Sequence, residues 1–199
     1  ARTYSTRELM QFFGDHFNSD QDSWVAEAAR VKLPIFVPTL HDSSIGIGMV
    51  QNYVKAKTAG KPYPKLDMIR DAYELAQVKY KSKKTAIVYL GGGVPKNYIQ
   101  QTEVISEVLG HDAGGHNYAI QLTMDMPVWG ALSGCTFKEA QSWGKIAKDA
   151  DFVQAHVDIT IGLPLLTTAL IQKKHLWEGR KRLNFQYEGD ELVSLRPQA

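Results

Sequence analysis

The chain has 199 residues, of which 44% are hydrophobic and 22% are charged, the composition of an ordinary globular protein with a buried core. Its formal net charge is only +2, so charge gives no reason to expect nucleic acid or a membrane surface as a partner. No apolar run approaches the roughly 20 residues that a membrane-spanning helix needs. The single cysteine, Cys135, excludes an internal disulfide framework and favours a reducing, cytoplasmic location.

The N-terminal part is predicted to form two helices and a strand. Residues Ser5 to Glu8 match the capping box that opens a helix. Four apolar residues follow at helical spacing and predict a buried face: Leu9, Phe12, Phe13 and Phe17. Ser23 is placed to cap a second helix that runs to about Val31. The apolar run 33–37 is then typical of a short buried strand.

A turn of small residues, 39–46, follows this strand and precedes a helical pattern that extends to about Lys57. Ligands of α/β proteins bind at such places, where a strand ends and a helix begins. Asp42 and Ser43 lie in this turn, and two interpretations are open. Either residue could cap the following helix, or Asp42 could contact a ligand.

The clearest buried strand of the sequence, 86–90, runs directly into three glycines, 91–93. Before it, a helix over 66–81 is predicted from an apolar face: Leu66, Ile69, Tyr73, Ala76 and Tyr80. After it, Pro95 favours the first turn of a helix that extends to about Leu109. Glycines between a strand and a helix allow the backbone to approach a dinucleotide closely. The spacing is not Gly-x-Gly-x-x-Gly, and a plain tight turn would use the same residues.

The second half of the chain continues the alternation of strands and helices. Strands are predicted at 118–123 and 152–157, and an apolar helix follows the second of them to about Gln172. The loop 111–116 holds two histidines and an aspartate but no further ligands at suitable spacing, so we predict no metal site there. Residues 175–199 are polar and weakly periodic, typical of a tail or of an arm that contacts a partner.

This alternation predicts an α/β fold, with a Rossmann-like parallel sheet covered by helices on both faces. The carboxyl ends of parallel strands meet at one edge of such a sheet. The residues that follow the predicted strands are Asp42, the 91–93 turn, Thr123, Met124 and Asp158. We therefore expect them to converge on one ligand site.

The segment 133–146, Ser-Gly-Cys-Thr-Phe-Lys-Glu-Ala-Gln-Ser-Trp-Gly-Lys-Ile, carries the strongest candidate for chemistry. A helix from about Thr136 would place Glu139 and Trp143 on one face, with Lys145 at its C-terminal end. A lysine attacks an imine carbon only as the neutral amine, so a catalytic one needs burial against apolar surface. Trp143 could supply that surface. The alternative is an ordinary solvated lysine near a helix end.

This segment resembles the active-site segment of deoxyhypusine synthase and its relatives. The resemblance extends to residues 38–46, 90–97 and 158–166, in the family's order, and the chain is similar to the prokaryotic deoxyhypusine synthase-like branch. Members of this family are longer. The resemblance implies that residues 1–174 are the C-terminal part of one NAD-binding domain, that an N-terminal portion completes the sheet, and that 175–199 form a polar tail.

The resemblance also implies a reaction. Deoxyhypusine synthase uses NAD to oxidise spermidine, passes the aminobutyl group to an enzyme lysine as an imine, and delivers it to an acceptor amine. In this sequence the catalytic lysine would be Lys145. The polyamine would contact Glu139, Trp143 and Asn97, and NAD would contact Asp42, Gly92, Thr123, Met124, Asp158 and Ile159. The family further implies a homotetramer with its sites between subunits.

Three positions depart from the family pattern. Ile47 and Leu132 stand where the family has acidic residues, and Asn97 stands where it has a histidine. The loss of two carboxylates suggests the same chemistry on a different donor or acceptor. One alternative is a homospermidine synthase-type enzyme with a small-molecule acceptor. Others are a non-catalytic NAD-binding paralogue that pairs with an active subunit, and a plain dehydrogenase. An incomplete sheet also predicts that this chain is unstable or aggregation-prone alone.

Overall fold

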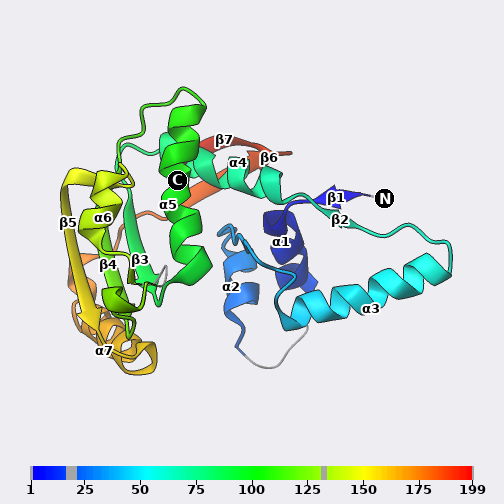
Figure 1. Ribbon diagram of the computed structural model, residues 1–199, viewed down its shortest axis with the longest axis horizontal. Helices are drawn as coiled ribbons and strands as arrows, with labels where there is room; N and C mark the ends of the chain where they lie inside the picture. Colours follow the sequence, from blue (N-terminus) through cyan, green and yellow to red (C-terminus); the bar gives the residue numbers. More distant parts are fainter. Residues whose placement is uncertain (1, 17–21, 131–133, 199) are drawn as a thin grey trace. The chain divides into compact units, whose positions relative to one another are not determined.

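The computed structural model describes residues 2–16, 22–130 and 134–198, and Figure 1 colours the chain from blue to red. The chain divides into two compact units, with one boundary inside a helix. Unit 1 comprises residues 1–75 and 184–194, and unit 2 comprises 76–183 and 195–199. Among the described residues, no helix is both long and apolar enough to cross a membrane.

Unit 1 is mainly helical. Its elements up to residue 75, in chain order, are β1 (Thr3–Tyr4), α1 (Thr6–His16), α2 (Trp24–Arg30), α3 (Ser44–Thr58), β2 (Lys65–Leu66) and the first part of α4 (Met68–Tyr80). The two short strands pair in parallel. Helices α1 and α2 pack closely at Gly14, where an added Cβ atom would lie 2.4 Å from the Cβ atom of Ala29. Glycine is therefore required at this crossing.

The predicted helix starts of unit 1 are confirmed. Ser5 Oγ accepts a hydrogen bond from the Glu8 N–H at 3.2 Å, and Glu8 Oε2 accepts one from the Ser5 N–H at 3.2 Å, which is the predicted capping box. Ser23 Oγ accepts from Ala26 N at 3.4 Å and caps α2. Ser43 Oγ accepts from Gly46 N at 3.1 Å and caps α3, so Ser43 is used as a cap.

Three predictions in unit 1 are wrong, and a fourth falls outside the described residues. Phe12, predicted on the buried face of α1, is 51% exposed. The run 33–37 forms no strand: Leu33 is 50% exposed, Pro34 has no N–H to donate, and the Val37 N–H donates to the hydroxyl of Thr6 at 2.9 Å. The helix predicted over 66–81 begins at Met68, because Leu66 belongs to β2, and Ile69 is exposed rather than buried. Phe17 is not among the described residues.

Unit 2 is built on a parallel sheet of three strands in the order β3-β4-β5. Its elements, after the end of α4, are β3 (Ala86–Leu90), α5 (Gly93–Val108), β4 (His116–Thr123), η1 (Pro127–Trp129), α6 (Phe137–Ser142), β5 (Ile146–His156), α7 (Ile159–Gln172) and η3 (Lys174–Leu176). This arrangement confirms the predicted α/β class with a parallel sheet.

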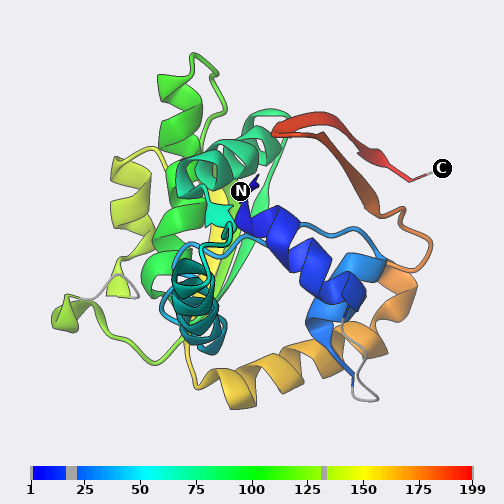
Figure 2. The same cartoon turned by 90° about the vertical axis from the view of Figure 1, so that its right-hand side faces the viewer.

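Helices α5 and α6 cover the same face of this sheet, as Figure 2 shows. Ile99 of α5 and Phe137 and Ala140 of α6 pack against Tyr89 and Ala119 of the strands, and these residues form the core of unit 2. The core lies between the sheet and the two helices α5 and α6, which carry Asn97 and Glu139. The positions of α5 and α6 are thus fixed by apolar burial.

The opposite face is met by α7 near the carboxyl end of the sheet. An added Cβ atom on Gly162 would lie 3.2 Å from Leu122 Cδ1, so helix and strand are in close contact there. Farther along this face, Val88 and Val153 remain 53% and 57% exposed. The strand 86–90, predicted as buried, is therefore buried on one face only.

Residues 175–199, predicted as a polar tail, contain two paired strands. These are β6 (Leu183–Glu188) and β7 (Glu191–Pro197). Gly189, with φ 64°, and Asp190 connect them in the short turn expected of a hairpin. The polarity of this stretch reflects exposed strands rather than a lack of structure. A role in contacting a partner stays a prediction.

Candidate active site

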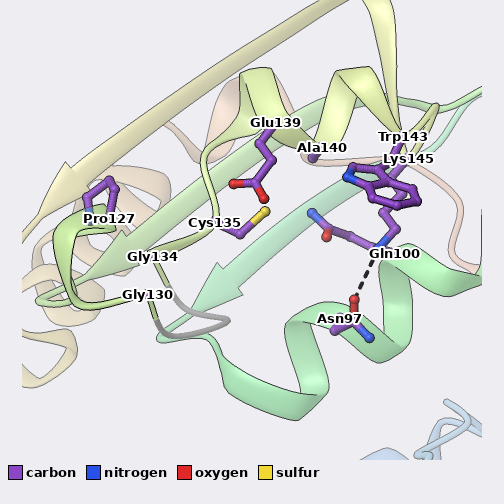
Figure 3. A pocket seen from close by; sticks show the side chains of 10 residues that line it. All are labelled: Asn97, Gln100, Pro127, Gly130, Gly134, Cys135, Glu139, Ala140, Trp143 and Lys145. Carbon is purple, nitrogen blue, oxygen red and sulfur yellow. Dashed lines mark hydrogen bonds between the residues drawn. The ribbon is translucent and has the colours of Figure 1, made fainter.

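A cavity of about 260 Å³ lies in unit 2 between α5 and the segment that leads from the end of β4 through α6 (Figure 3). Its lining mixes amide, charged, aromatic and small residues: Asn97, Gln100, Pro127, Gly130, Gly134, Cys135, Glu139, Ala140, Trp143 and Lys145. Four of these are the residues predicted to bind substrate or to carry catalysis. The structure brings Asn97, Glu139, Trp143 and Lys145 to one place.

Lys145 reaches the cavity because the chain turns sharply after α6. Trp143 is the C-cap of the helix, and Gly144 follows with φ 73°, a left-handed conformation that favours glycine. The Lys145 N–H donates to the Ala140 carbonyl at 3.0 Å and fixes the turn. The Lys145 side chain is half-buried, and its Nζ donates to Asn97 Oδ1 of α5 at 3.1 Å (Figure 3).

Glu139 lies on the cavity side of α6 because the opposite side of that helix is buried. Thr136 Oγ1 accepts from the Glu139 N–H at 3.1 Å and caps the helix. Phe137 and Ala140 point into the core. Figure 3 shows the Glu139 carboxylate directed toward the thiol of Cys135. Burial and the nearby carboxylate raise the pKa of the Cys135 thiol, which favours the neutral thiol.

The prediction of a helix that carries Glu139 and Trp143 on one face and ends at Lys145 is wrong in its extent. The helix ends at Ser142, and Trp143 beyond it is 69% exposed. Gly144 breaks the helical path before Lys145. The Lys145 Nζ nevertheless lies 6.0 Å from the centroid of the Trp143 ring, at the outer limit of a cation–π contact.

Sequence reasoning missed three polar groups at this site. Gln100 and Cys135 line the cavity, and Cys135 entered the prediction only as evidence of redox compartment. Lys96 lies behind the lining, where its Nζ donates to the Cys135 carbonyl at 2.6 Å. A signal for Lys96 was present, since it precedes Ile99 and Gln100 by three and four residues. These spacings place all three on the inner face of α5.

The predicted cofactor residues of unit 2 lie at the carboxyl ends of three neighbouring strands. They are Gly92, Thr123, Met124, Asp158 and Ile159. The Gly91 N–H donates to the Leu122 carbonyl at 2.8 Å, and the Val157 N–H donates to the Thr123 carbonyl at 3.1 Å. An added Cβ atom on Gly91 would lie 3.4 Å from Ile159 Cδ1. The strand ends therefore converge as the sequence predicted.

The backbone of the glycine turn is open at the start of α5. Gly92 is the N-cap of α5, and among the described residues no side chain caps this helix, so its first N–H groups are open to an anion. Gly91 and Gly93 have φ 85° and 70°, and an added Cβ atom on Gly93 would meet nothing within 4 Å. A phosphate could therefore approach this backbone without a steric clash.

Two other predicted cofactor residues use their side chains locally. Thr123 is buried, and its hydroxyl accepts from the Asp125 N–H at 3.1 Å. Asp158 caps α7, accepting from the Thr160 N–H at 2.8 Å, and the hydrogen bonds from Thr160 lower the pKa of the carboxyl. Met124 is exposed beside them. The cofactor roles of these residues stay predictions.

Several predicted positions lie outside this cavity. Asp42 and Ile47 are exposed residues of unit 1, whereas the cavity belongs to unit 2. Leu132 is not among the described residues. In the 111–116 loop, His111 stacks on Tyr80 with ring centroids 3.9 Å apart, and His116 is the first residue of β4. Among the described residues, no group of three His, Cys, Asp or Glu is arranged to hold a metal ion.

The sequence model of the family described as Deoxyhypusine synthase matches residues 1–170 of this chain. The chain belongs to the deoxyhypusine synthase family. "Probable deoxyhypusine synthase 2" of Methanosarcina acetivorans is 48% identical, in an alignment that covers 94% of this chain and 56% of the relative. A protein with the same description from Archaeoglobus fulgidus is 47% identical over 84% of this chain and 54% of the relative.

Bacterial relatives are also similar. The "Deoxyhypusine synthase-like protein" of Elusimicrobium minutum is 37% identical, and the alignment covers 92% of this chain and 48% of the relative. The chain thus spans about half the length of the curated relatives it matches. Family membership confirms the resemblance on which the sequence interpretation depends. The roles of individual deoxyhypusine synthase-like site residues stay predictions.

Proposed function

We propose that this protein is an NAD-dependent transferase that moves an aminobutyl-type group from a polyamine to an acceptor amine through an imine on Lys145. The observation that carries the proposal is the half-buried Lys145 amine, bonded at 3.1 Å to the amide oxygen of Asn97 in a cavity that also contains Glu139. The amide oxygen of Asn97 accepts from Lys145 Nζ and so orients the amine at the cavity wall. Membership of the deoxyhypusine synthase family supports the same reaction class.

Glu139 and Trp143 are suited to bind the polyamine. The Glu139 carboxylate would pair with one ammonium group of the donor in a charge-assisted hydrogen bond. The exposed face of the Trp143 indole would lie along the alkyl chain and its charge. Among the described residues, the cavity lining contributes a single carboxylate, so we expect one ammonium group to be anchored there.

The cofactor would be held at the carboxyl edge of the sheet, by the Gly92 turn and by the residues around Thr123 and Asp158. When bound, NAD would supply hydride chemistry at the donor carbon next to the secondary amine. The open N-terminus of α5 supports this placement, because it offers unpaired N–H groups to a phosphate. Asp42 is proposed as a further contact from unit 1.

The group transfer itself would be carried by Lys145. Its neutral amine adds to the imine carbon of the oxidised donor and forms a new C–N bond. The C–N bond to the departing diamine then breaks, and that amine leaves with the proton that Lys145 gives up. The acceptor amine later displaces Lys145 by the same exchange. Asn97 directs the lone pair of Lys145 through the 3.1 Å hydrogen bond.

Borohydride trapping of the full-length protein tests this proposal. Incubation with NAD and a panel of polyamines, followed by borohydride, should leave a reduced aminobutyl-type adduct on Lys145, identified by peptide mass. Omission of NAD should abolish the adduct, because the donor imine would not form. Absence of an adduct across the whole panel would overturn the proposal and favour a non-catalytic subunit.

A small amine is the second candidate for the acceptor, as in a homospermidine synthase-type enzyme. Asn97 favours it, because it stands where the family resemblance places a histidine and so changes the immediate surroundings of Lys145. Competition between putrescine and a lysine-containing acceptor protein would separate the two. Transfer to putrescine alone supports the small acceptor, and transfer to the protein lysine excludes it.

A further inference from the structure

Lys96 is a buried lysine on the inner face of α5 that the proposed reaction does not use. It is 3% exposed, and its Nζ lies 5.7 Å and 5.8 Å from the ring centroids of Tyr89 and Phe137. Burial lowers the pKa of its amine. A lysine amine loses its hydrating water when it is buried, and hydrogen bonds to protein acceptors must replace that water. The acceptors of Lys96 therefore indicate its role.

The acceptors of Lys96 lie on two different walls of the site. Its Nζ donates to Gln121 Oε1 at 3.0 Å and to the Cys135 carbonyl at 2.6 Å. Gln121 is fully buried on β4, and its Nε2 donates to the Gly91 carbonyl at 2.8 Å. A chain of hydrogen bonds therefore runs from Gly91 through Gln121 and Lys96 to Cys135.

Both ends of this chain precede segments of the candidate active site. Gly91 begins the glycine turn that leads into α5 and Asn97. Cys135 immediately precedes Thr136, which is the N-cap of α6. Helix α6 carries Glu139, and Lys145 follows shortly after the helix ends. Among the described residues, no strand pairing joins Gly91 to Cys135. The buried ammonium thus spans the two segments that meet in the Lys145–Asn97 hydrogen bond.

We propose that Lys96 is a positioning residue for the reaction: it ties the glycine turn to the start of α6 and so sets where Lys145 meets its substrate. This inference rests on the proposed function of Lys145. Lys96 is not one of the residues that line the cavity. It therefore acts on rate through geometry, and an error of about 1 Å at a reacting group can cost on the order of 100-fold.

The test uses Lys96→Met, Gln121→Met and the double variant in the full-length protein, with Lys84→Met as the matched control. Methionine matches glutamine in length, is one atom shorter than lysine, and removes the hydrogen bonds of both side chains. Lys84 is an exposed lysine of the loop before β3. We expect Lys96→Met to lower kcat by about 10- to 100-fold and to change the KM for the polyamine by less than about threefold. Lys84→Met should match the parent.

The two single variants should be coupled. Because both break the same chain of hydrogen bonds, the double variant should be no slower than the slower single variant within about twofold. Amide hydrogen exchange supplies a readout that needs no activity: exchange should quicken both in the 91–96 segment and in the 134–140 segment. If Lys96→Met does not fold, Gln121→Met decides the question alone, because it leaves the charge in place.

Three results would overturn the inference. The first is trapping of Lys145 at the parent rate in both single variants. The second is a double variant in which the rate losses of the two single variants multiply. The third is a rate loss caused by partial unfolding, so that cooling restores both the fold and the rate. These results are distinct from failure of the proposed function. If the parent protein itself forms no Lys145 adduct, the transferase proposal fails, whatever the exchange experiment shows for Lys96.

Discussion

Two lysines beside the β3–β5 sheet are bonded in different ways. At the amino end, Lys79 is 4% exposed, forms an ion pair with Glu103 at 3.1 Å, and donates to the carbonyls of Ala113 and Gly114 at 2.6 Å and 2.8 Å. Lys145, which directly precedes β5, is half-buried, lines a cavity and donates to an amide.

The two lysines differ in the groups that accept their hydrogen bonds and in their access to a cavity. The charge of Lys79 is balanced by a buried carboxylate and two carbonyls, so its contacts serve packing. Lys145 meets a neutral amide at the wall of a cavity, where a ligand can reach it. Sequence position alone does not distinguish them, since both lie near the C-terminal end of a helix.

Replacement of Lys145 should produce the largest loss of rate. In Lys145→Arg the positive charge is kept, but guanidinium does not form the imine. The rate should fall at least about 1000-fold, which corresponds to about 4 kcal/mol of activation free energy. The midpoint of thermal unfolding should shift by less than about 2 °C. Lys138→Arg, an exposed position on α6, is the matched control and should keep the parent rate.

Replacement of Lys79 should show the reverse pattern. Lys79→Met leaves Glu103 buried without its counter-charge, so the free energy of unfolding should fall by about 3–5 kcal/mol. The rate per folded molecule should stay within about twofold. Chemical denaturation and active-site titration measure the two quantities separately. A stable variant with a collapsed rate would contradict the division of roles between the two lysines.

Removal of the Asn97 amide should have an intermediate effect on rate. Asn97→Ala deletes the acceptor that orients Lys145, and the loss of one hydrogen bond is worth about 1 kcal/mol, or roughly 5- to 10-fold in the rate of imine formation. Asn97→Asp is a second variant of the same position. It gives Lys145 a carboxylate partner, as Lys79 has in Glu103. Its rate should recover only at higher pH; an unchanged pH profile would count against the orienting role.

His116, at the amino end, should affect only the pH dependence of stability. Burial, with the charge of Lys79, lowers the pKa of His116 from 6.5 to about 4. The unfolded chain therefore binds more protons between pH 6.5 and 4, and the free energy of unfolding falls as the pH drops through this window. His116→Gln should flatten that slope in acid denaturation experiments, whereas His175→Gln, at an exposed position, should leave it unchanged.

Much of this architecture could be read from local pattern. The capping box at Ser5 and Glu8, the glycine turn after β3 and the parallel sheet follow from short-range spacing, and each is confirmed. The strand predicted over 33–37 is wrong, because an apolar run forms a strand only where another strand pairs with it. The extent of α6 was overestimated because Gly144, with its left-handed backbone, ends the helix before Lys145.

The sequence by itself determined the family, the α/β class and the residues that meet in the cavity, because motif spacing and strand–helix alternation are properties of the chain. Only the tertiary structure showed that Asn97 is the acceptor for Lys145 and that Lys96 joins Gln121 to Cys135. These contacts join residues 25 to 48 positions apart along the chain. Hydrogen bonds over such separations depend on how helices pack on the sheet, and local spacing does not encode that geometry.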